Sequence, residues 1–232
     1  MGSRVVVATF DAVGGPAALS KADDGYYAGP TDAGVYRVAL CGKHSSPSYP
    51  DWSKIRWGSE IKEEGGAIFV KHDGRWQDLK ILSPRLSKQT IMDRNLELYG
   101  TYTLPKTWVF NDFGHMTCYF YKDRNNNGRL DRQLDEHIHA EYFHTTPDDE
   151  AVSAAGGTVN LGPSHGCIHL KPKDIDAMIG NGYFKPGNKV VVHSYTTAMP
   201  AWVNDSTGVG PFEVHFFPGS KKVIVSGRRR SL

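Results

Sequence analysis

The sequence predicts a mostly β fold. Its 232 residues include 25 glycines, 13 prolines, 11 tyrosines and 10 phenylalanines. This composition favours many short strands and turns over long helices. Hydrophobic residues make up 39% of the chain and charged residues 22%, as in an ordinary globular protein. The length suits one large domain or two small ones.

Charge and hydropathy exclude several classes of partner. The formal net charge of +2 is too small to argue for nucleic acid binding, and the run Arg228–Arg230 is interpreted as a solvated tail. No run of about 18 apolar residues occurs, so we expect no membrane span. The apolar run Val5–Val7 is too short for a signal peptide. We therefore expect that the chain follows a removed signal, leaves the cell by another route, or works inside.

The first half of the chain has three strand or hairpin signals. Residues 4–10 predict a first strand, and a turn at 29–34 leads into a strand through Val38. Residues 67–76 predict a hairpin that turns at Asp73-Gly74. Between these elements, residues 42–66 are polar but contain two tryptophans, which predicts an ordered loop or insertion.

Two segments predict helices. Residues 86–98 carry loosely spaced apolar residues. A second helix follows Pro172, which suits a first helical position. Its apolar stripe is Ile175, Met178 and Ile179, at i, i+3 and i+4, and two glycines soon after would end it.

The second half predicts further strands. Residues 137–144 alternate, with His144 at the strand's end and on the same face as Tyr142. Residues 147–163 are first acidic and then rich in Gly and Ala, which predicts a mobile connection. The other predicted strands are 107–109, 115–121, 190–193, and a closing hairpin of 212–217 with 222–225.

Residues 123–131 resemble the first part of a calcium loop. Oxygen side chains occupy positions 1, 3, 5 and 9, and Gly128 occupies position 6. Leu134 stands where the bidentate glutamate would be, and no flanking helices are evident. A polar hairpin turn is therefore the favoured interpretation, with calcium binding as the alternative.

The chemistry of the sequence concentrates at Ser164–Leu170. Cys167 has a histidine two residues to each side, and histidine is the side chain best suited to accept a thiol proton near neutral pH. Gly166 permits an unusual backbone conformation, in which consecutive N–H groups could face a developing oxyanion. The other two cysteines, Cys41 and Cys118, form either one disulfide or two free thiols.

The run Ser164-His165-Gly166-Cys167-Ile168-x-Leu170 resembles the active-site signature of the L,D-transpeptidases, a catalytic domain often called YkuD. The family also has an upstream histidine followed by a small residue, and His144-Thr145 resembles it. Two departures stand out. His169 replaces the usual arginine or asparagine, and the 23 positions from His144 to Cys167 exceed the common spacing. The resemblance covers about residues 27–195, including Thr31–Tyr36, which is similar to the family's Thr-Pro-x-Gly-x-Tyr element.

The resemblance implies a fold and a reaction. The expected fold is a YkuD-type curved antiparallel sheet or sandwich with two or three short helices, in a single domain over residues 1–232 with added terminal strands. Cys167 would attack a carbonyl in a peptidoglycan stem peptide to form a thioester, which an amine from a second stem would resolve. The implied site is in the periplasm or the extracellular cell wall. No cofactor is implied, and the oligomeric state stays open.

Each site residue has an implied role. His144 would take and return the thiol proton, oriented by the backbone carbonyl of Thr145. Backbone N–H groups of Gly166 and Cys167 would hold the oxyanion. The residues expected to contact substrate are Ser164, His165 and His169.

Other functions use the same residues. Water could resolve the thioester, which would make the protein an L,D-carboxypeptidase or endopeptidase. If residues 165–169 were extended, His165, Cys167 and His169 could bind zinc with His144 or the His137/His139 pair. A zinc-binding or non-catalytic wall-binding module is therefore an alternative, as is a toxin delivered into a neighbour's periplasm.

Overall fold

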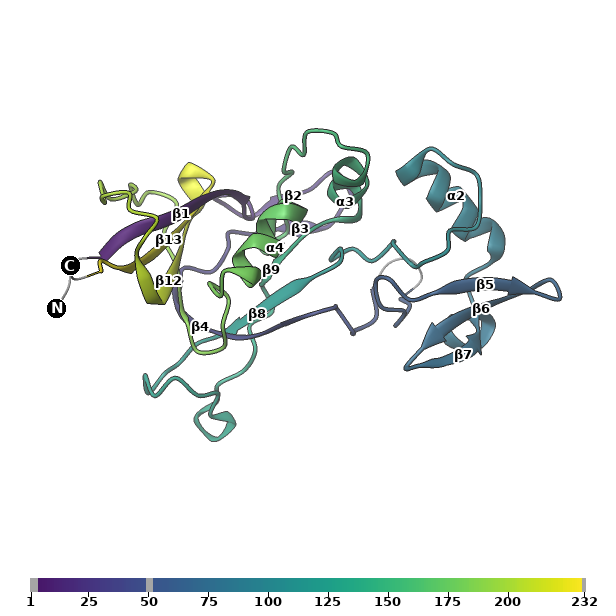
Figure 1. Cartoon of the computed structure of the whole chain (residues 1–232), viewed down its shortest axis with the longest axis horizontal. Coiled ribbons are helices and arrows are strands. Elements are labelled where there is room, and N and C mark those ends of the chain that lie inside the picture. Colours follow the sequence, from purple (N-terminus) through teal and green to yellow (C-terminus); the bar gives the residue numbers. More distant parts are fainter. Residues whose placement is uncertain (1–3, 49–51, 231–232) are drawn as a thin grey trace. The chain divides into compact units, whose positions relative to one another are not determined.

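The computed structural model describes residues 4–48 and 52–230 (Figure 1). Met1–Ser3 of the predicted start and Pro50 of the predicted insertion lie outside the described residues. The chain forms two compact units. We call residues up to 41, 118–144 and 160 onwards the barrel unit, and residues 42–117 and 145–159 the insertion unit. Within the described ranges, no helix is both long and apolar enough to cross a membrane.

The barrel unit is built on a closed sheet of eight strands, not on the open sandwich that the resemblance implied. Because β1 pairs with both β10 and β13, the sheet closes on itself. The sheet is also not purely antiparallel, since β9–β10 and β11–β12 are parallel pairs. In sheet order the strands are β1 (Arg4–Val13), β10 (Ile168–Leu170), β9 (Phe143–His144), β8 (Thr117–Tyr121), β4 (Gly34–Gly42), β11 (Lys189–Val192), β12 (Val209–Phe217) and β13 (Lys222–Arg228).

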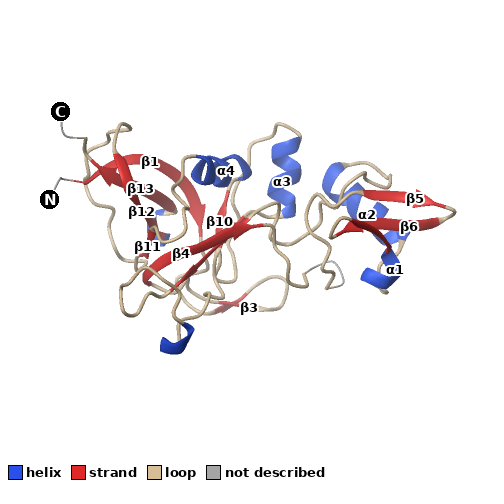
Figure 2. Cartoon of the chain, turned by 60° about the horizontal axis from the view of Figure 1, so that its bottom comes forward, coloured by secondary structure: helices blue, strands red, loops and turns tan. Residues whose placement is uncertain are grey.

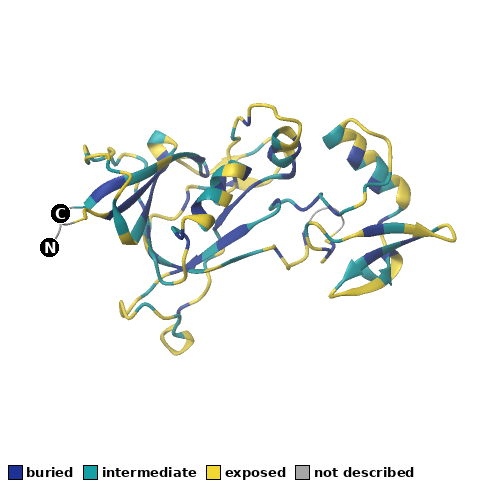
Figure 3. Ribbon diagram, in the orientation of Figure 1, coloured by how far each residue is buried: buried dark blue, intermediate teal, exposed yellow. Residues whose placement is uncertain are grey.

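Aromatic side chains fill the barrel. Tyr36, Phe120 and Phe143 come from three neighbouring strands and are all at most 1% exposed. The Phe120 ring centroid lies 4.8 Å from that of Tyr36 and 5.8 Å from that of Phe143. Figure 3 shows β8 largely as a buried strand, whereas β4 has buried residues between intermediate and exposed ones. This packing fixes β9, the strand that carries His144, against its neighbours.

Four α-helices occur among the described residues, against the two or three expected (Figure 2). The helices after Pro172 and over 86–98 are confirmed as α4 and α2, but α3 falls in the predicted mobile connection. Its start has a clear physical cause: Thr146 caps the N-terminus, Pro147 opens the first turn and three acidic residues follow. The helices are α1 (Leu79–Leu82), α2 (Lys88–Tyr99), α3 (Pro147–Ala154) and α4 (Pro172–Gly180), with short 3₁₀ turns at Arg132–Leu134 and Pro218–Ser220.

The insertion unit has a sheet and a core of its own. Its strands are β5 (Ile61–Glu64), β6 (Ala67–His72) and β7 (Arg75–Asp78). The predicted turn between β6 and β7 is confirmed, because Asp73 and Gly74 have φ values of 47° and 78°. Ile55, Trp108 and Phe110 are buried in the core. The expected role of the tryptophans is wrong for Trp52, which is 73% exposed, and Ile55 anchors that segment instead.

Two strand predictions fail in part. Residues 107–109 make only one bridge, between Thr107 and Glu60. Of residues 137–144, only Phe143 and His144 form a regular strand. The side chains of His137 and His139 instead bind carboxylates, at 2.7 Å from Asp135 and 3.3 Å from Asp32. These polar contacts replace the regular ladder that the alternating pattern predicts. A remaining small sheet pairs β2 (Ser20–Lys21) with β3 (Tyr27–Ala28).

The calcium-like segment is a polar turn between antiparallel segments, because Tyr121 bridges Ile138. Its carboxylates accept hydrogen bonds from nitrogen donors. Asp123 accepts from Arg37 at 3.0 Å and from the Gly128 amide at 2.9 Å. Asp131 accepts from the Asn125 side chain at 2.9 Å. These contacts give the loop its shape.

Of the two alternatives for Cys41 and Cys118, the structure has the disulfide. The bond joins the end region of β4 to the start of β8, with the two Cα atoms 4.1 Å apart and 77 positions apart in sequence. It therefore closes the base of the 42–117 insertion.

Removing the disulfide should destabilise the protein. We expect the double variant Cys41→Ser/Cys118→Ser to lose about 2–4 kcal/mol of unfolding free energy, because an open loop of this length gains entropy when the chain unfolds. Urea unfolding of the variant and of a Cys167→Ser control measures the loss. Equal midpoints would show that the bond adds no stability.

Candidate active site

The turn at residues 164–167 is held by hydrogen bonds to three consecutive carbonyls. The His165 carbonyl accepts from the Gly29 amide at 3.2 Å. The Gly166 carbonyl accepts from the Thr31 hydroxyl at 2.8 Å. The Cys167 carbonyl accepts from the hydroxyl of Ser164. With each peptide plane fixed in this way, the backbone around the cysteine is pre-organised.

Ser164 stabilises this turn from within. Its side chain is buried, and its hydroxyl accepts from the Gly166 amide at 3.1 Å while it donates to the Cys167 carbonyl. Its own amide donates to the carbonyl of Gly14 at 3.2 Å. The hydroxyl is thus engaged in local geometry, and the expected contact between Ser164 and substrate stays a prediction.

Gly166 has a φ of 149°, which L side chains rarely adopt. It also lies against a neighbouring carboxylate: a Cβ built at this position would be 3.0 Å from Oε1 of Glu141. A side chain at position 166 would therefore strain the backbone and displace Glu141.

We expect Gly166→Ala to lower stability by about 1–2 kcal/mol and to slow any reaction at Cys167, since the turn that carries the sulfur must shift. Thermal unfolding and the rate of alkylation by iodoacetamide measure the two effects. Gly162→Ala is the matched control, because a Cβ at that position meets nothing within 4 Å. If iodoacetamide alkylated the Gly166→Ala variant at the wild-type rate, this result would contradict a geometric role for Gly166.

Cys167 is the one free cysteine, and its thiol is partly buried. Its sulfur lies 4.0 Å from the carbonyl oxygen of Ala140. Burial raises the pKa of the thiol to about 11; the backbone N–H of Tyr142 opposes this shift and the charge of Glu141 adds to it. At neutral pH the thiol is therefore protonated, and a base must take its proton before the sulfur can attack a carbonyl.

His144 lies on the strand next to the cysteine. The parallel register of β9 and β10 pairs Phe143 with Ile168 and His144 with His169, so Cys167 stands level with Tyr142. Cys167 directly precedes β10 in the bend that contains Gly166, and it therefore lies near the start of β9. Two residues along the strand and one strand spacing place their Cα atoms about 8 Å apart. Side chains at that separation can meet.

His169 packs against His144. The two ring centroids are 4.7 Å apart in an edge-to-face arrangement. His169 is 9% exposed, and its Nδ1 lies 3.0 Å from the carbonyl oxygen of Gly162. Burial lowers the pKa of His169, so the ring is neutral near pH 7 and Nδ1–H donates to that carbonyl. The contact limits the rotation of His144, while recognition of a substrate carboxylate by His169 stays a prediction.

His165 and Thr145 have different surroundings. The exposed ring of His165 contacts the carboxylate of Asp24, with Nε2 3.0 Å from Oδ2. Thr145 is buried, and its hydroxyl donates to the carboxylate of Glu150 on α3, which also binds the His115 ring. Thr145 is therefore fixed directly after His144. The role of its carbonyl as an orienting group stays a prediction.

The zinc alternative does not have its ligands assembled. Across residues 4–48 and 52–230, no group of three or more His, Cys, Asp or Glu side chains is placed to hold a metal ion. Gly166 breaks the extended conformation in which His165, Cys167 and His169 would face the same way. His137 and His139 are each paired with an aspartate.

Sequence reasoning missed three residues that support the site. Thr31 is 2% exposed; its hydroxyl donates to Gly166 and accepts from the Gly15 amide at 3.1 Å. Tyr195 joins the same network, since its hydroxyl donates to the Gly15 carbonyl at 2.6 Å and accepts from the Thr31 amide at 3.2 Å. The third is Glu141. The resemblance of the segment around Thr31 to a family element was the available signal for Thr31, whereas Tyr195 lies outside any motif.

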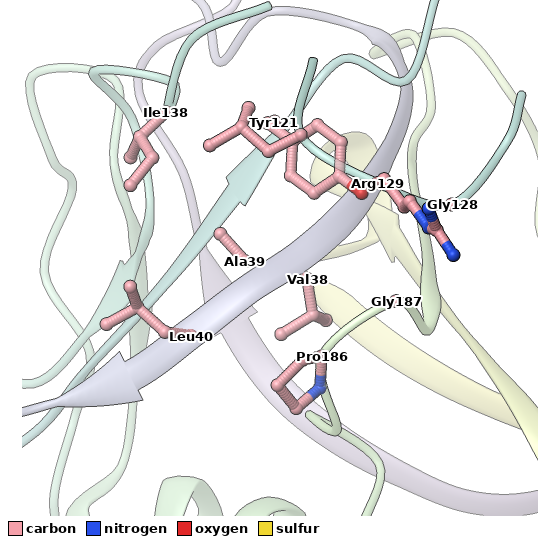
Figure 4. A pocket seen from close by; sticks show the side chains of 10 residues that line it. Val38, Ala39, Leu40, Tyr121, Gly128, Arg129, Ile138, Pro186 and Gly187 are labelled. Carbon is pink, nitrogen blue, oxygen red and sulfur yellow. The ribbon is translucent and has the colours of Figure 1, made fainter. Parts of the chain in front are cut away.

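A pocket of about 280 Å³ lies on the barrel unit away from the predicted site residues (Figure 4). Val38–Leu40 of β4 form one wall, and Tyr121 and Ile138 stand across from them. A second pocket of about 310 Å³ belongs to the insertion unit, where Lys43, Arg56 and Lys71 are among its lining residues. None of the predicted site residues lines either pocket.

Comparison with known protein families identifies the class. The family model for the L,D-transpeptidase catalytic domain, YkuD, matches residues 3–192. That range contains all the predicted site residues and six of the eight barrel strands, with only β12 and β13 outside it, so the match is not confined to the cysteine motif. The chain matches no curated protein and no solved structure.

The chain therefore belongs to the YkuD family of L,D-transpeptidase catalytic domains. Members of this family are enzymes that act on the peptides of cell-wall peptidoglycan. The observed fold, which is mostly β with few helices, is consistent with a YkuD domain.

Proposed function

We propose that this protein is a cysteine-dependent L,D-transpeptidase that cross-links peptidoglycan stem peptides. The single observation that carries the proposal is the parallel pairing of β9 with β10, which puts His144 on the strand next to β10, while Cys167 directly precedes β10. In the first half of the reaction, Cys167 attacks the carbonyl of the L-centred third residue of a donor tetrapeptide. The terminal D-alanine leaves, and the acyl group remains on sulfur as a thioester.

His144 is the proposed base and acid. A thiol with a pKa of about 11 needs its proton removed at neutral pH, and the imidazole can take that proton and pass it to the leaving amine. The ring of His169 supports His144 from the side. The proposed role of the Thr145 carbonyl is to hold the imidazole in the correct tautomer.

The proposed oxyanion donor is the backbone N–H of Cys167. The N–H and C=O of a trans peptide point in opposite directions. Because the Gly166 carbonyl points to Thr31, the Cys167 N–H of the same peptide points away from Thr31. The Gly166 N–H, in contrast, already donates to Ser164. We therefore assign the main stabilisation of the oxyanion to Cys167 itself.

The proposed location is the periplasm or the extracellular cell wall, where peptidoglycan is found. The Cys41–Cys118 disulfide supports this proposal, because disulfides persist in oxidising compartments and are rare in the cytosol. Delivery into the periplasm of a neighbouring cell would meet the same condition.

Hydrolysis is the second candidate, since a water molecule could resolve the same thioester. The two outcomes share every residue of the acylation half-reaction. What distinguishes them is whether an amine reaches the thioester before water does.

The test uses defined muropeptides. The wild-type protein is incubated with a disaccharide tetrapeptide, alone and with an amine acceptor, and the products are identified by mass spectrometry. A cross-linked dimer with loss of D-alanine supports the proposal, and a tripeptide alone supports hydrolysis. If the protein is not acylated by a carbapenem and leaves the tetrapeptide untouched, the proposed function is wrong.

A further inference from the structure

Glu141 stands beside the cysteine without a neutralising partner. Its carboxylate accepts one hydrogen bond, from the Asp32 amide to Oε2 at 2.7 Å. Its other oxygen, Oε1, lies against Gly166, where an added Cβ would be 3.0 Å away. Its charge raises the pKa of the Cys167 thiol. The carboxylate therefore borders the position where an acyl group on sulfur would sit.

The neighbouring carboxylate, that of Asp32, has more hydrogen-bond donors than Glu141. Asp32 accepts from Lys122 at 2.8 Å, from the Tyr36 hydroxyl at 3.0 Å and from His139 at 3.3 Å. Lys122 and His139 therefore contact Asp32 and not Glu141. Among the described residues, no Lys, Arg or His is within ion-pair distance of Glu141, although the charges of Lys122 and His139 reach it from farther away.

A bare negative charge beside the nucleophile is a disadvantage for acylation, because it disfavours the thiolate. The second half-reaction has the opposite requirement. An acceptor amine arrives as an ammonium ion near neutral pH and cannot attack until it loses a proton. A half-buried carboxylate without a cation of its own both attracts that ammonium and accepts its proton. Burial also raises the pKa of Glu141, which makes the carboxylate a better base.

We propose that Glu141 binds the cationic amine of the acceptor and takes one of its protons. This inference rests on the proposed transpeptidase function and adds a residue to it. In the step, the ammonium gives one proton to Glu141 and its nitrogen forms an amide bond to the acyl carbon. The carbon–sulfur bond breaks, and its electron pair stays on Cys167. A second proton passes from nitrogen to His144, and the third remains on the new amide.

The test is the substitution Glu141→Gln, which keeps an oxygen for the Asp32 amide and removes the charge. Two acceptors are compared: glycine amide, which is largely cationic near neutral pH, and hydroxylamine, which is largely uncharged there. We expect the ratio of aminolysis to hydrolysis to fall about tenfold for glycine amide and to change little for hydroxylamine. Acylation by a carbapenem should be at least as fast as in wild type, because the thiolate is no longer disfavoured.

Two further variants complete the experiment. Glu141→Asp keeps the charge one methylene farther back and should retain part of the preference for the cationic acceptor. Asp135→Asn removes an exposed carboxylate that pairs with Arg124 and His137, and it should leave both ratios unchanged. If the glutamine variant folds poorly, the aspartate variant still gives the comparison between acceptors.

The outcomes separate the two proposals. Equal losses with both acceptors, or an unchanged ratio with glycine amide, would overturn the role of Glu141 while leaving the transpeptidase function intact. A wild-type protein that a carbapenem does not acylate would refute the function itself.

Discussion

The Cys167→Ala variant is expected to form no covalent adduct with a carbapenem and to lose about 10⁴-fold or more of the activity on tetrapeptides. The methyl side chain cannot attack a carbonyl, and no second thiol can replace the sulfur, because Cys41 and Cys118 are joined to each other. Intact-protein mass spectrometry after incubation with the carbapenem measures the adduct, and muropeptide analysis measures the residual activity.

The substitution should leave the fold unchanged. The turn is held by its backbone carbonyls and by the hydroxyls of Ser164 and Thr31, and none of these bonds involves the sulfur. Equal thermal unfolding of the variant and the wild type is the control. A variant that unfolds normally and still forms a stable adduct would place the nucleophile elsewhere in the chain.

The His144→Ala variant should lose about 10³-fold in the acylation rate at neutral pH, as is typical for the loss of a general base. The thiol then ionises without assistance. Because burial places its pKa at about 11, the residual rate should rise about tenfold for each pH unit up to that value. In the wild type, the imidazole makes the rate much less dependent on hydroxide.

Acylation by a carbapenem, followed by stopped-flow fluorescence or quenched mass spectrometry across the pH range, gives both profiles. The control is His137→Ala, since His137 is exposed and pairs with Asp135. A variant of His144 whose rate is lower but has the wild-type pH profile would indicate a packing role against His169 in place of proton transfer.

Local patterns predicted many elements of the fold. The first strand, the β6–β7 hairpin, α2, α4 and the closing β12–β13 hairpin all occur where alternation, turn residues or helical spacing predict them. Two features depend on contacts that no short pattern encodes. Closure of the barrel requires β1 to pair on both edges, with β13 and with β10. The strand that ends at His144 is short, and before it His139 binds Asp32 from a distant segment while His137 binds the nearby Asp135.

Helix α3 was not predicted, for a different reason. Its glycine- and alanine-rich continuation suggested a flexible connection, and this composition masked a clear start signal. Thr146, Pro147 and the acidic residues that follow are the usual signs of a helix N-terminus. Greater weight on these local signals would have placed the helix.

The candidate site likewise contains residues that the sequence could predict and residues that it could not. The residues with distinctive chemistry, Cys167 and His144, could be selected from spacing and from the resemblance. Their supports could not, because Thr31, Tyr195 and Glu141 lie far from them in sequence or act through hydrogen bonds to the backbone. Sequence reasoning also assigned the Gly166 N–H to the oxyanion, whereas in the structure that group donates to Ser164.

The disulfide between Cys41 and Cys118, which joins the two ends of the 42–117 segment, affects how readily this segment can be replaced. The ends of that segment leave and re-enter the barrel at Cα atoms 4.1 Å apart, on strands that are adjacent in the sheet. A span of two residues can bridge such a gap. An ancestral or engineered chain can therefore exchange this segment for a hairpin turn, or for a different module, without re-routing any strand of its host.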